Sequence, residues 1–337
     1  MTSDNAPTSH NAPLPADGLQ PRSELATCVN TVIDHENRKA LAAVEALCDS
    51  TEVGLERFND LAVRSKLVNE DEWAAFLSAN QALDLREWVN RLLAAKLLTA
   101  WQIHKLLAGK YKGFVIGNYQ VRETLGQGAA GAVYCGQHQT MRRPVALKVL
   151  ADKVTRDDDS MVIVFERLGM LTDLDHEHVV HYFDVGESNR AVYMVMELIT
   201  GRTLQQLVRR YGRLPRAVVG EVGRQLLKAL DHIHSETGVL SRSAADNIIA
   251  DSLGQIHVLP LDLTSALSLG LEFDGKSRLA AIETFRNLLC SLDSRNDEDQ
   301  NDGLDDSRFG NWHRWTDDQI KVVSQSDSPW AELSTWL

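Results

Sequence analysis

Three glycines and one lysine are the residues whose types and spacing point most directly to chemistry. Gly126, Gly128 and Gly131 lie in one short run, and Lys148 follows 22 positions after Gly126 in an apolar stretch. Glycine lets a backbone approach an anion closely, and a buried lysine is costly unless a negative group meets it. The pattern therefore predicts a hairpin that covers phosphate groups. A glycine-rich hairpin without a ligand is the alternative, and a dinucleotide-binding loop is disfavoured because β-forming residues follow Gly131.

A longer resemblance covers about residues 117–290, roughly half of the chain. This segment resembles a bacterial Ser/Thr protein kinase domain of the eukaryotic-like, Hanks type, in the glycine run and in the strand that carries Lys148. Leu174–Val180 resembles the turn after the family's regulatory helix, and Tyr193–Leu198 resembles its strand into the hinge. The resemblance implies ATP as the ligand, held between a strand-rich lobe and a helical lobe.

The resemblance also implies the walls of a nucleotide pocket. Met196 takes the gatekeeper position, and Glu197 and Leu198 offer backbone groups to an adenine ring. Apolar residues form the ceiling of the pocket, although core packing explains them equally well. The predicted nucleotide-binding residues are Leu125, Gly126, Gly128, Gly131, Val133, Ala146, Lys148, Met196, Glu197 and Leu198.

The segment that should carry the chemistry departs from the family pattern. The family has a His-Arg-Asp motif, whose Asp accepts the proton of the substrate hydroxyl, and an Asn further on that holds magnesium. The matching segment here is Val239–Ile249. If Asn247 is matched to the family's Asn, the position of the base falls on Arg242. If Arg242 is matched to the Arg of the motif, with a one-residue deletion further on, the position of the base falls on Ser243. Neither residue can act as a carboxylate base, so we expect no catalytic residue.

The metal-binding triplet of the family is altered as well. A hairpin predicted over 248–258 leads to Pro260-Leu261-Asp262, where the family has Asp-Phe-Gly. Proline supplies no magnesium ligand, and Asp262 is displaced by two residues, which is about 6 to 7 Å in an extended segment. Asn247 and Asp262 are weak candidates for metal ligands. We therefore expect no metal site, and the use of magnesium is doubtful.

Two more departures concern an ion pair and the substrate surface. The family pairs its lysine with an acidic residue on the next helix, but Arg167 stands at that place here and Glu166 lies about 100° away around the helix. Only about eighteen residues separate Pro260 from a helix expected at Ser277–Leu292, and no Ala-Pro-Glu motif occurs. The surface that would hold a peptide substrate is therefore expected to be missing.

Hydrophobic patterns show which elements must position these residues. Helical periodicity before about residue 112, with helix starts at Asn69 and Thr99, gives way to alternating strands and then to longer helices. We predict the class α+β, with a kinase-like bilobal domain preceded by a small all-α domain that recruits a partner or fixes the first lobe. The predicted segments are a disordered tail at 1–22, the helical domain at 23–112, an N-lobe at 113–198 and a truncated C-lobe at 199–337 with an acidic loop at about 293–306. Strands are expected at 119–124, 132–138, 145–149, 181–185 and 191–197, and helices at about 160–174, 216–235 and 277–292.

Composition limits the classes of partner. The net charge of -12 and the pI near 5.4 disfavour a non-specific nucleic-acid binder. No window approaches the ~18 apolar residues of a spanning helix, and the N-terminus lacks the pattern of an export signal, so we expect a cytoplasmic protein without a membrane partner. Four cysteines without paired spacing indicate neither a zinc site nor disulfides.

Three further clusters have plain interpretations. Seven acids within 293–306 predict a solvated loop, because their spacing does not follow a calcium-binding motif. The tryptophans that follow are expected to fold back onto the helical lobe, because aromatic burial orders such a segment. The clustered histidines are expected to pack or cap rather than bind metal. These residues are Trp312, Trp315, Trp330 and Trp336, and His176, His178, His181, His232 and His234.

Three functional hypotheses remain open. The leading one is a pseudokinase, a regulatory or scaffold protein in signalling that binds ATP through the glycine run and Lys148 without transferring phosphate. The second is an active Ser/Thr protein kinase that uses displaced residues such as Asp246 or Asp262. The third is an interaction module whose nucleotide pocket is empty. We expect a protein partner under the leading hypothesis and no nucleic acid.

Overall fold

The computed structural model falls into two compact units, which are taken separately here. Unit 1 comprises residues 1–33, 163–181 and 199–337, and unit 2 comprises 34–162 and 182–198. The predicted domain boundaries stay predictions. The structure describes residues 21–51, 53–81, 83–128, 131–150, 169–189, 191–238, 244–260, 275–293, 319–320, 323, 325–326 and 328–334, without the side chains of 32–40, 49–50 and 275–279.

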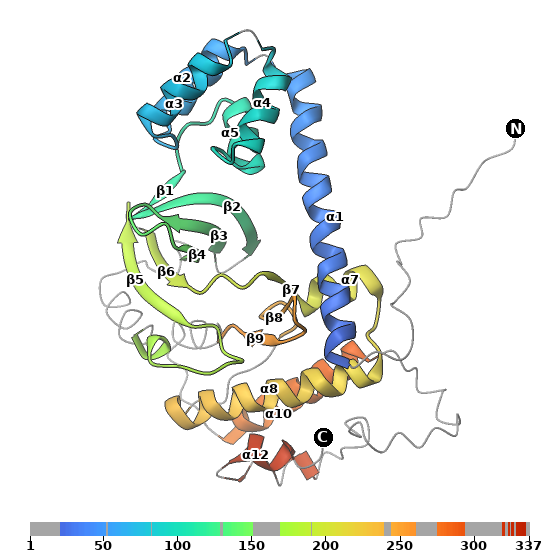
Figure 1. Cartoon of the computed structure of the whole chain (residues 1–337). Helices are drawn as coiled ribbons and strands as arrows, with labels where there is room; N and C mark the ends of the chain where they lie inside the picture. Colours follow the sequence, from blue (N-terminus) through green and yellow to red (C-terminus); the bar gives the residue numbers. More distant parts are fainter. Residues whose placement is uncertain are drawn as a thin grey trace, which may run out of the picture. The chain divides into compact units, whose positions relative to one another are not determined.

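Helix α1 (Pro21–Ser50) is the longest helix in the described part of the chain and is drawn in blue in Figure 1. It begins one residue before the predicted end of the tail, whose residues 1–20 lie outside the described residues. Its early residues belong to unit 1 and its later residues belong to unit 2. Val44, near its end, is buried in the helical core of unit 2.

The helical layer of unit 2 consists of two similar helix pairs. They are α2 (Leu55–Arg64) with α3 (Glu70–Ala79), and α4 (Leu85–Ala94) with α5 (Ala100–Leu107). In each pair a lysine of positive φ, Lys66 or Lys96, follows the first helix. Three residues later the predicted start, Asn69 or Thr99, caps the second helix through its side chain, so both predicted starts are confirmed. Rings of Phe58, Trp73, Phe76 and Trp88 form the centre of this layer.

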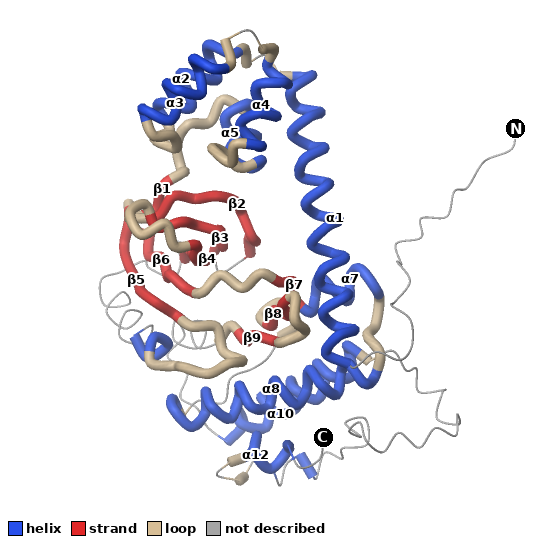
Figure 2. The backbone as a smooth tube through the Cα atoms, in the orientation of Figure 1, coloured by secondary structure: helices blue, strands red, loops and turns tan. Residues whose placement is uncertain are grey.

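The strands of unit 2 form one antiparallel six-stranded sheet in the order β1-β2-β3-β4-β6-β5, seen as red strands in Figure 2. All five predicted strands are present, and β2 runs four residues further than expected, into the glycine run. The strands are β1 (Val115–Ile116), β2 (Tyr119–Gly128), β3 (Gly131–His138), β4 (Pro144–Leu150), β5 (Tyr182–Ser188) and β6 (Ala191–Met196).

Side-chain hydrogen bonds join the helical layer to strand β2 within unit 2. The Thr99 hydroxyl donates to the carbonyl of Arg122 at 2.5 Å, and the buried Gln102 amide donates to the carbonyl of Val121 at 2.8 Å. From the strand side, the Gln120 amide donates to the carbonyl of Leu67 at 2.9 Å. Because buried polar groups are costly to leave unpaired, these bonds favour one docking position for the helices on the sheet.

Unit 1 is built around helix α8 (Arg216–Thr237), which buries one stripe of apolar side chains as its periodicity predicts. A three-stranded sheet in the order β7-β8-β9 and four further helices complete its described part. These elements are β7 (Gly201–Thr203), α7 (Leu204–Tyr211), β8 (Ile248–Asp251), β9 (Ile256–Val258), α10 (Gly275–Leu292) and α12 (Pro329–Ser334), together with the early residues of α1. The class α+β is thus confirmed.

Within unit 1, the C-terminal segment packs on the other helices through Trp330. Trp330 is fully buried, and its ring lies 5.8 Å from the ring of Phe285 on α10. The prediction of a folded-back tail is confirmed for this residue, while Trp312, Trp315 and Trp336 lie outside the described residues. The same holds for residues 294–306 of the predicted acidic loop and for 160–168 of the predicted helix. No helix in the described part combines the length and apolar character needed to cross a membrane.

Candidate nucleotide site

Two rows of side chains share one face of the six-stranded sheet. Residues that pair directly across antiparallel strands project to the same side, and so do alternate residues of one strand. The register therefore puts five predicted residues on one face: Gly126, Val133, Ala146, Lys148 and Met196. It also adds Cys135 and Met194, which sequence reasoning missed although the alternation of each strand could have revealed them. The rows are Val133, Lys148 and Met194, and Cys135, Ala146 and Met196.

Lys148 lies in the middle of this face and is only 4% exposed. The opposite face of the same sheet carries the apolar cluster around Leu147 and Val195. Alternation along β4 thus keeps the ammonium group of Lys148 out of that cluster. A buried ammonium group is stable only among polar or negative groups, so this face is suited to an anion.

Gly131 is required by the sheet itself. It has a φ of +133°, and a Cβ at this position would lie 1.9 Å from the backbone carbonyl oxygen of Val149. Gly126 and Gly128 differ, because a Cβ at either position would meet no described atom within 4 Å. Their side-chain space is open, as a close approach of the backbone to a ligand requires.

The remaining predicted nucleotide residues lie at an irregular point of β2 and directly after β6. Leu125 lies at an irregularity in the pairing of β2 with β3, between Thr124 and Gly126, and is 43% exposed. Glu197 is exposed and Leu198 is half-buried, directly after the last residue of β6. Their backbone groups are not part of the sheet ladder, which leaves them available to a ligand.

Cys135 is the one nucleophile type on this face among the described residues. Burial, and to a lesser extent the carboxylate of Glu123, raises the pKa of its thiol to about 11. The thiol is therefore protonated at neutral pH and acts as a small apolar group in the row.

The matching catalytic segment lies in unit 1 at the start of hairpin β8–β9, which was predicted over 248–258. Asn247 closes a turn by donating its N–H to the carbonyl of Ala244 at 2.9 Å. Its own carbonyl accepts the N–H of Leu259 at 2.8 Å. The buried Pro260 comes next in the chain, so it lies beside the loop that carries Asn247. Arg242, Ser243 and Asp262 lie outside the described residues.

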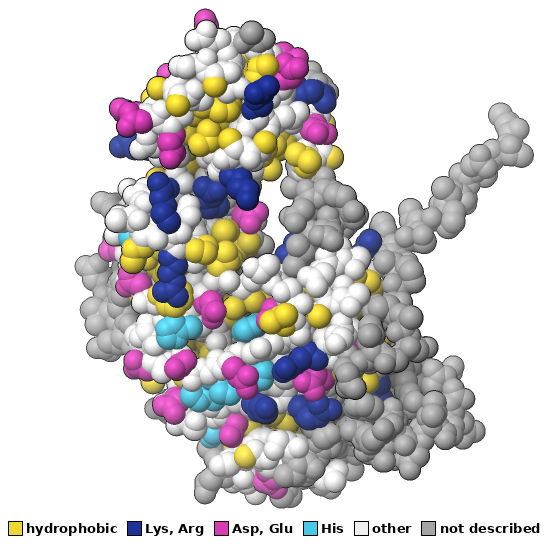
Figure 3. All heavy atoms as spheres, in the orientation of Figure 1, with side chains coloured by type: hydrophobic (Ala, Val, Ile, Leu, Met, Phe, Trp, Pro, Cys, Tyr) yellow, Lys and Arg dark blue, Asp and Glu magenta, His cyan; other side chains and the backbone are white. Residues whose placement is uncertain are grey.

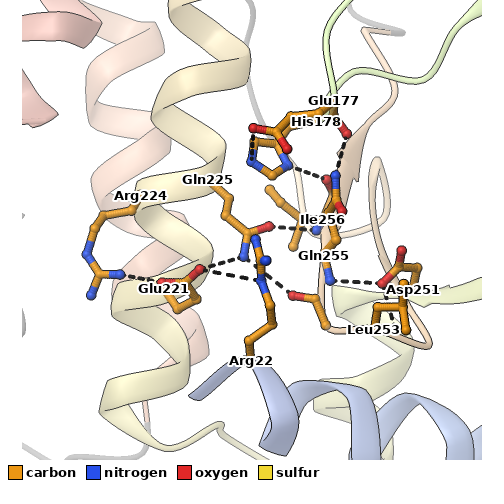
Figure 4. A network of polar contacts seen from close by, with 11 residues as sticks. Arg22, Glu177, His178, Glu221, Arg224, Gln225, Asp251, Leu253, Gln255 and Ile256 are labelled. Carbon is orange, nitrogen blue, oxygen red and sulfur yellow. Dashed lines mark hydrogen bonds and ion pairs between the residues drawn. The ribbon is translucent and has the colours of Figure 1, made fainter. Parts of the chain in front are cut away.

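A polar network fixes this hairpin within unit 1 (Figure 4). The buried Gln225 of α8 accepts the N–H of Ile256 at 2.8 Å, and Nδ1 of His178 donates to the carbonyl of Ile256 at 3.1 Å. The carboxylate of Asp251 accepts two backbone N–H groups of the turn, including that of Gln255 at 2.8 Å. These hydrogen bonds fix the hairpin that lies between Asn247 and Pro260 in the chain.

Helix α1 contacts the same hairpin from another side. Arg22 lies 3.9 Å from the carboxylate of Glu221, which also pairs with Arg224. The carbonyl of Arg22 lies so close to Gly254 that a Cβ there would be 1.9 Å away. Glu221 in turn accepts a hydrogen bond from Gln225, which links α1 to the network around Ile256 (Figure 4).

Asn247 and Pro260 are the described residues at the places that the resemblance assigns to magnesium ligands. Asn247 supplies one amide oxygen, and Pro260 supplies no side-chain oxygen where the resemblance calls for a carboxylate. The described residues hold no group of three or more His, Cys, Asp or Glu that could bind a metal. The histidines lie near one another in pairs, with the ring of His176 stacked 5.0 Å from that of His232.

Comparison with known proteins defines the class of this domain. Residues 119–273 match the family model described as the protein kinase domain. This segment is therefore similar to a protein kinase domain, and the predicted kinase-like fold is confirmed. The match covers less than half of the 337 residues and leaves the helical layer of unit 2 outside it.

The individual relatives are named as serine/threonine kinases. The chain is 28% identical over 154 residues to serine/threonine-protein kinase PrkC of Bacillus subtilis, covering 46% of this chain and 24% of PrkC. It is 27% identical over 157 residues to a probable serine/threonine-protein kinase of Clostridium perfringens, a match that covers 46% of this chain and 23% of that kinase. The chain thus spans about a quarter of the length of these curated relatives. Among solved structures, the PknI kinase domain of Mycobacterium tuberculosis is 26% identical over 53% of this chain and 77% of the PknI chain, with a TM-score of 0.46.

Proposed function

We propose that this protein is a pseudokinase, a kinase-like regulatory or scaffold protein that binds ATP and does not transfer its phosphoryl group. The observation that carries this proposal is the hydrogen bond between the Leu259 N–H and the Asn247 carbonyl. It brings Pro260 next to Asn247 at the point where the kinase pattern has a magnesium-binding carboxylate. Phosphoryl transfer relies on metal ions that bridge the phosphates, so loss of this ligand removes most of the catalytic power.

The nucleotide part of the proposal rests on the face around Lys148. The buried ammonium group would meet phosphate oxygens, and Gly126 and Gly128 leave room for the backbone to approach them. The apolar side chains of Val133, Ala146 and Met196 would pack against the adenine ring. ATP binding of this kind needs no carboxylate and no metal from the protein.

The helical layer supports a role beyond catalysis. Its hydrogen bonds to strand β2 fix the sheet from outside the segment that matches the kinase domain. We propose that this layer stabilises the nucleotide-binding lobe and presents a surface to a protein partner.

An active Ser/Thr protein kinase is the second candidate, favoured by its similarity to relatives that are named serine/threonine kinases. In that case Asp246, which is exposed beside Asn247, or Asp262 would replace the missing carboxylates. An interaction module with an empty nucleotide pocket remains the third candidate, and it predicts no effect of ATP on stability.

Phosphoryl transfer from labelled ATP to a generic protein substrate, with magnesium or manganese, tests the proposal. We expect no transfer above the level of a Lys148→Ala variant. Transfer that is lost in Asp246→Ala or Asp262→Ala would overturn the proposal and establish an enzyme. Asp173→Ala, which removes an exposed carboxylate elsewhere, is the matched control and should leave any such transfer unchanged.

A further inference from the structure

A polar hollow lies where the helical layer of unit 2 meets the strands β2 and β3. Its volume is about 270 Å³, and a second hollow of about 200 Å³ shares several lining residues with it. The walls come from the two lysine-containing turns of the helix pairs, from Gln120 and Arg122 of β2, and from the far end of β3. Gln137 lines both hollows near the end of β3 that is remote from the glycine hairpin. This location separates the hollow from the candidate nucleotide site along the strand.

Positive charge is concentrated at this hollow in a chain whose net charge is -12. Lys96, Arg122 and Arg142 line the larger hollow, and Lys66 lines the smaller one. Among the described lining residues the single acid is Glu72, so the larger hollow has a surplus of two positive charges. Figure 3 shows Lys and Arg side chains gathered between the helical layer and the sheet of unit 2.

No carboxylate forms an ion pair with these four cations among the described residues. Elsewhere in the same unit, by contrast, Arg57 and Arg64 both pair with Asp60, at 3.0 and 3.3 Å. Arg122 is half-buried, and its burial lowers the pKa of the guanidinium, as does the charge of Arg142, while Cys135 and the carboxylate of Glu123 raise it. The fold therefore holds positive charges close together and partly removes Arg122 from water, which is unfavourable unless an anion is bound.

Local backbone geometry reinforces this picture. Four non-glycine residues of the described chain have positive φ, and three of them, Lys66, Lys96 and Arg142, line the hollows. Lys66 and Lys96 take the same place in the two repeated turns, where glycine or asparagine is the usual residue. Lysine thus occupies both turns although a positive φ disfavours a long side chain there.

We propose that this hollow binds the phosphoryl group of a phosphorylated ligand. Two guanidinium groups and an ammonium group suit a tetrahedral anion with three acceptor oxygens, because arginine matches phosphate in a bidentate manner. A phosphate monoester carries about -1.5 to -2 at neutral pH, which balances the surplus charge, whereas one carboxylate does not. The group can come from a phosphorylated Ser or Thr side chain or from a small phosphate ester. This site does not depend on ATP binding at Lys148.

Titration calorimetry on the full chain tests the proposal with three probes. They are inorganic phosphate, a short Gly/Ala peptide with one phosphoserine, and the same peptide with glutamate at that position. We expect saturable binding of the phosphorylated probes, and at least about tenfold weaker binding in Arg142→Gln and in Lys96→Gln, because each variant removes a charge-assisted contact. Arg91→Gln removes an exposed cation from α4 outside the hollow and should bind as the unaltered chain does.

The outcomes separate the two sources of the phosphoryl group. A phosphopeptide that binds at least about tenfold tighter than inorganic phosphate identifies a protein side chain, and equal binding identifies a small ester. Repeating the titration in Lys148→Ala excludes the nucleotide site, since binding in the hollow should persist there. The proposal is overturned by absence of saturable binding, by glutamate peptide binding as tight as phosphopeptide binding, or by unchanged affinity in both Arg142→Gln and Lys96→Gln with native circular dichroism.

Discussion

Substitution of Gly254 by alanine tests how the early part of α1 is attached to the hairpin β8–β9. Gly254 has a φ of +74°, and its added Cβ would lie 1.9 Å from the carbonyl oxygen of Arg22. Gly238 is the matched control, because its φ of +69° is similar but an added Cβ would meet no described atom within 4 Å. Left-handed backbone costs a non-glycine residue about 1–2 kcal/mol, so both variants should lose this amount.

The excess loss in Gly254→Ala measures the docking of α1. Ordinary contact begins near 3.4 Å, so the carbonyl of Arg22 must move by about 1.5 Å and draw the first turn of α1 with it. That shift weakens the hydrogen bond from Asn30 to Ser252, worth about 0.5–1.5 kcal/mol, and the half-exposed pair of Arg22 with Glu221, worth less than about 1 kcal/mol. We therefore expect an excess of about 1–2 kcal/mol over Gly238→Ala.

Urea unfolding, followed by fluorescence and by circular dichroism, gives the free energy of unfolding of each variant if the two probes report the same transition. Hydrogen exchange supplies a local measurement, and we expect the amides of 21–31 to exchange faster in Gly254→Ala alone. Equal losses in the two variants, within about 0.5 kcal/mol, together with unchanged exchange in 21–31, would refute the reasoning that α1 is seated against Gly254.

Three further predictions follow from single residues. Gly131→Ala should lower the free energy of unfolding in urea by more than about 2 kcal/mol, because the added Cβ meets the Val149 carbonyl. Gly128→Ala should leave this free energy unchanged and weaken ATP binding in a titration. Trp330→Ala should cost about 3–5 kcal/mol of unfolding free energy, and a loss below about 1 kcal/mol would contradict its full burial. Burial lowers the pKa of His178 below 6.5, so the unfolded state binds the proton more readily than the folded state does. The free energy of unfolding should therefore fall as the pH drops below about 6.5. This fall should be smaller in His178→Gln.

Local features of the fold were predictable from the sequence. The helix starts at Asn69 and Thr99 depend on side chains that cap their own helices, and both occur as expected. The strands of unit 2 follow from β-forming residues between turns, and the glycine run lies in a hairpin rather than at a helix start. These elements are set by contacts among near neighbours in the chain, which periodicity and composition report.

The features that join distant segments were not predictable. The docking of α1 depends on residues such as Arg22 and Gly254, which no periodicity relates. The sequence explained the glycine at position 131 by phosphate binding. The structure adds a second reason, because a Cβ there would collide with the backbone carbonyl of Val149 on β4. Likewise, Lys96 and Arg142 look like ordinary surface residues until the fold brings them to one hollow.

The dependence of ATP binding on magnesium tests the central claim most directly. Thermal unfolding of the full chain should shift upward with ATP in the presence of a chelator, and by the same amount with magnesium, because the binding face supplies its own cation in Lys148. Lys148→Ala should lose the shift, and Lys110→Ala, which removes an exposed lysine, should keep it. A shift that requires magnesium, accompanied by transfer of the terminal phosphate, would contradict the account.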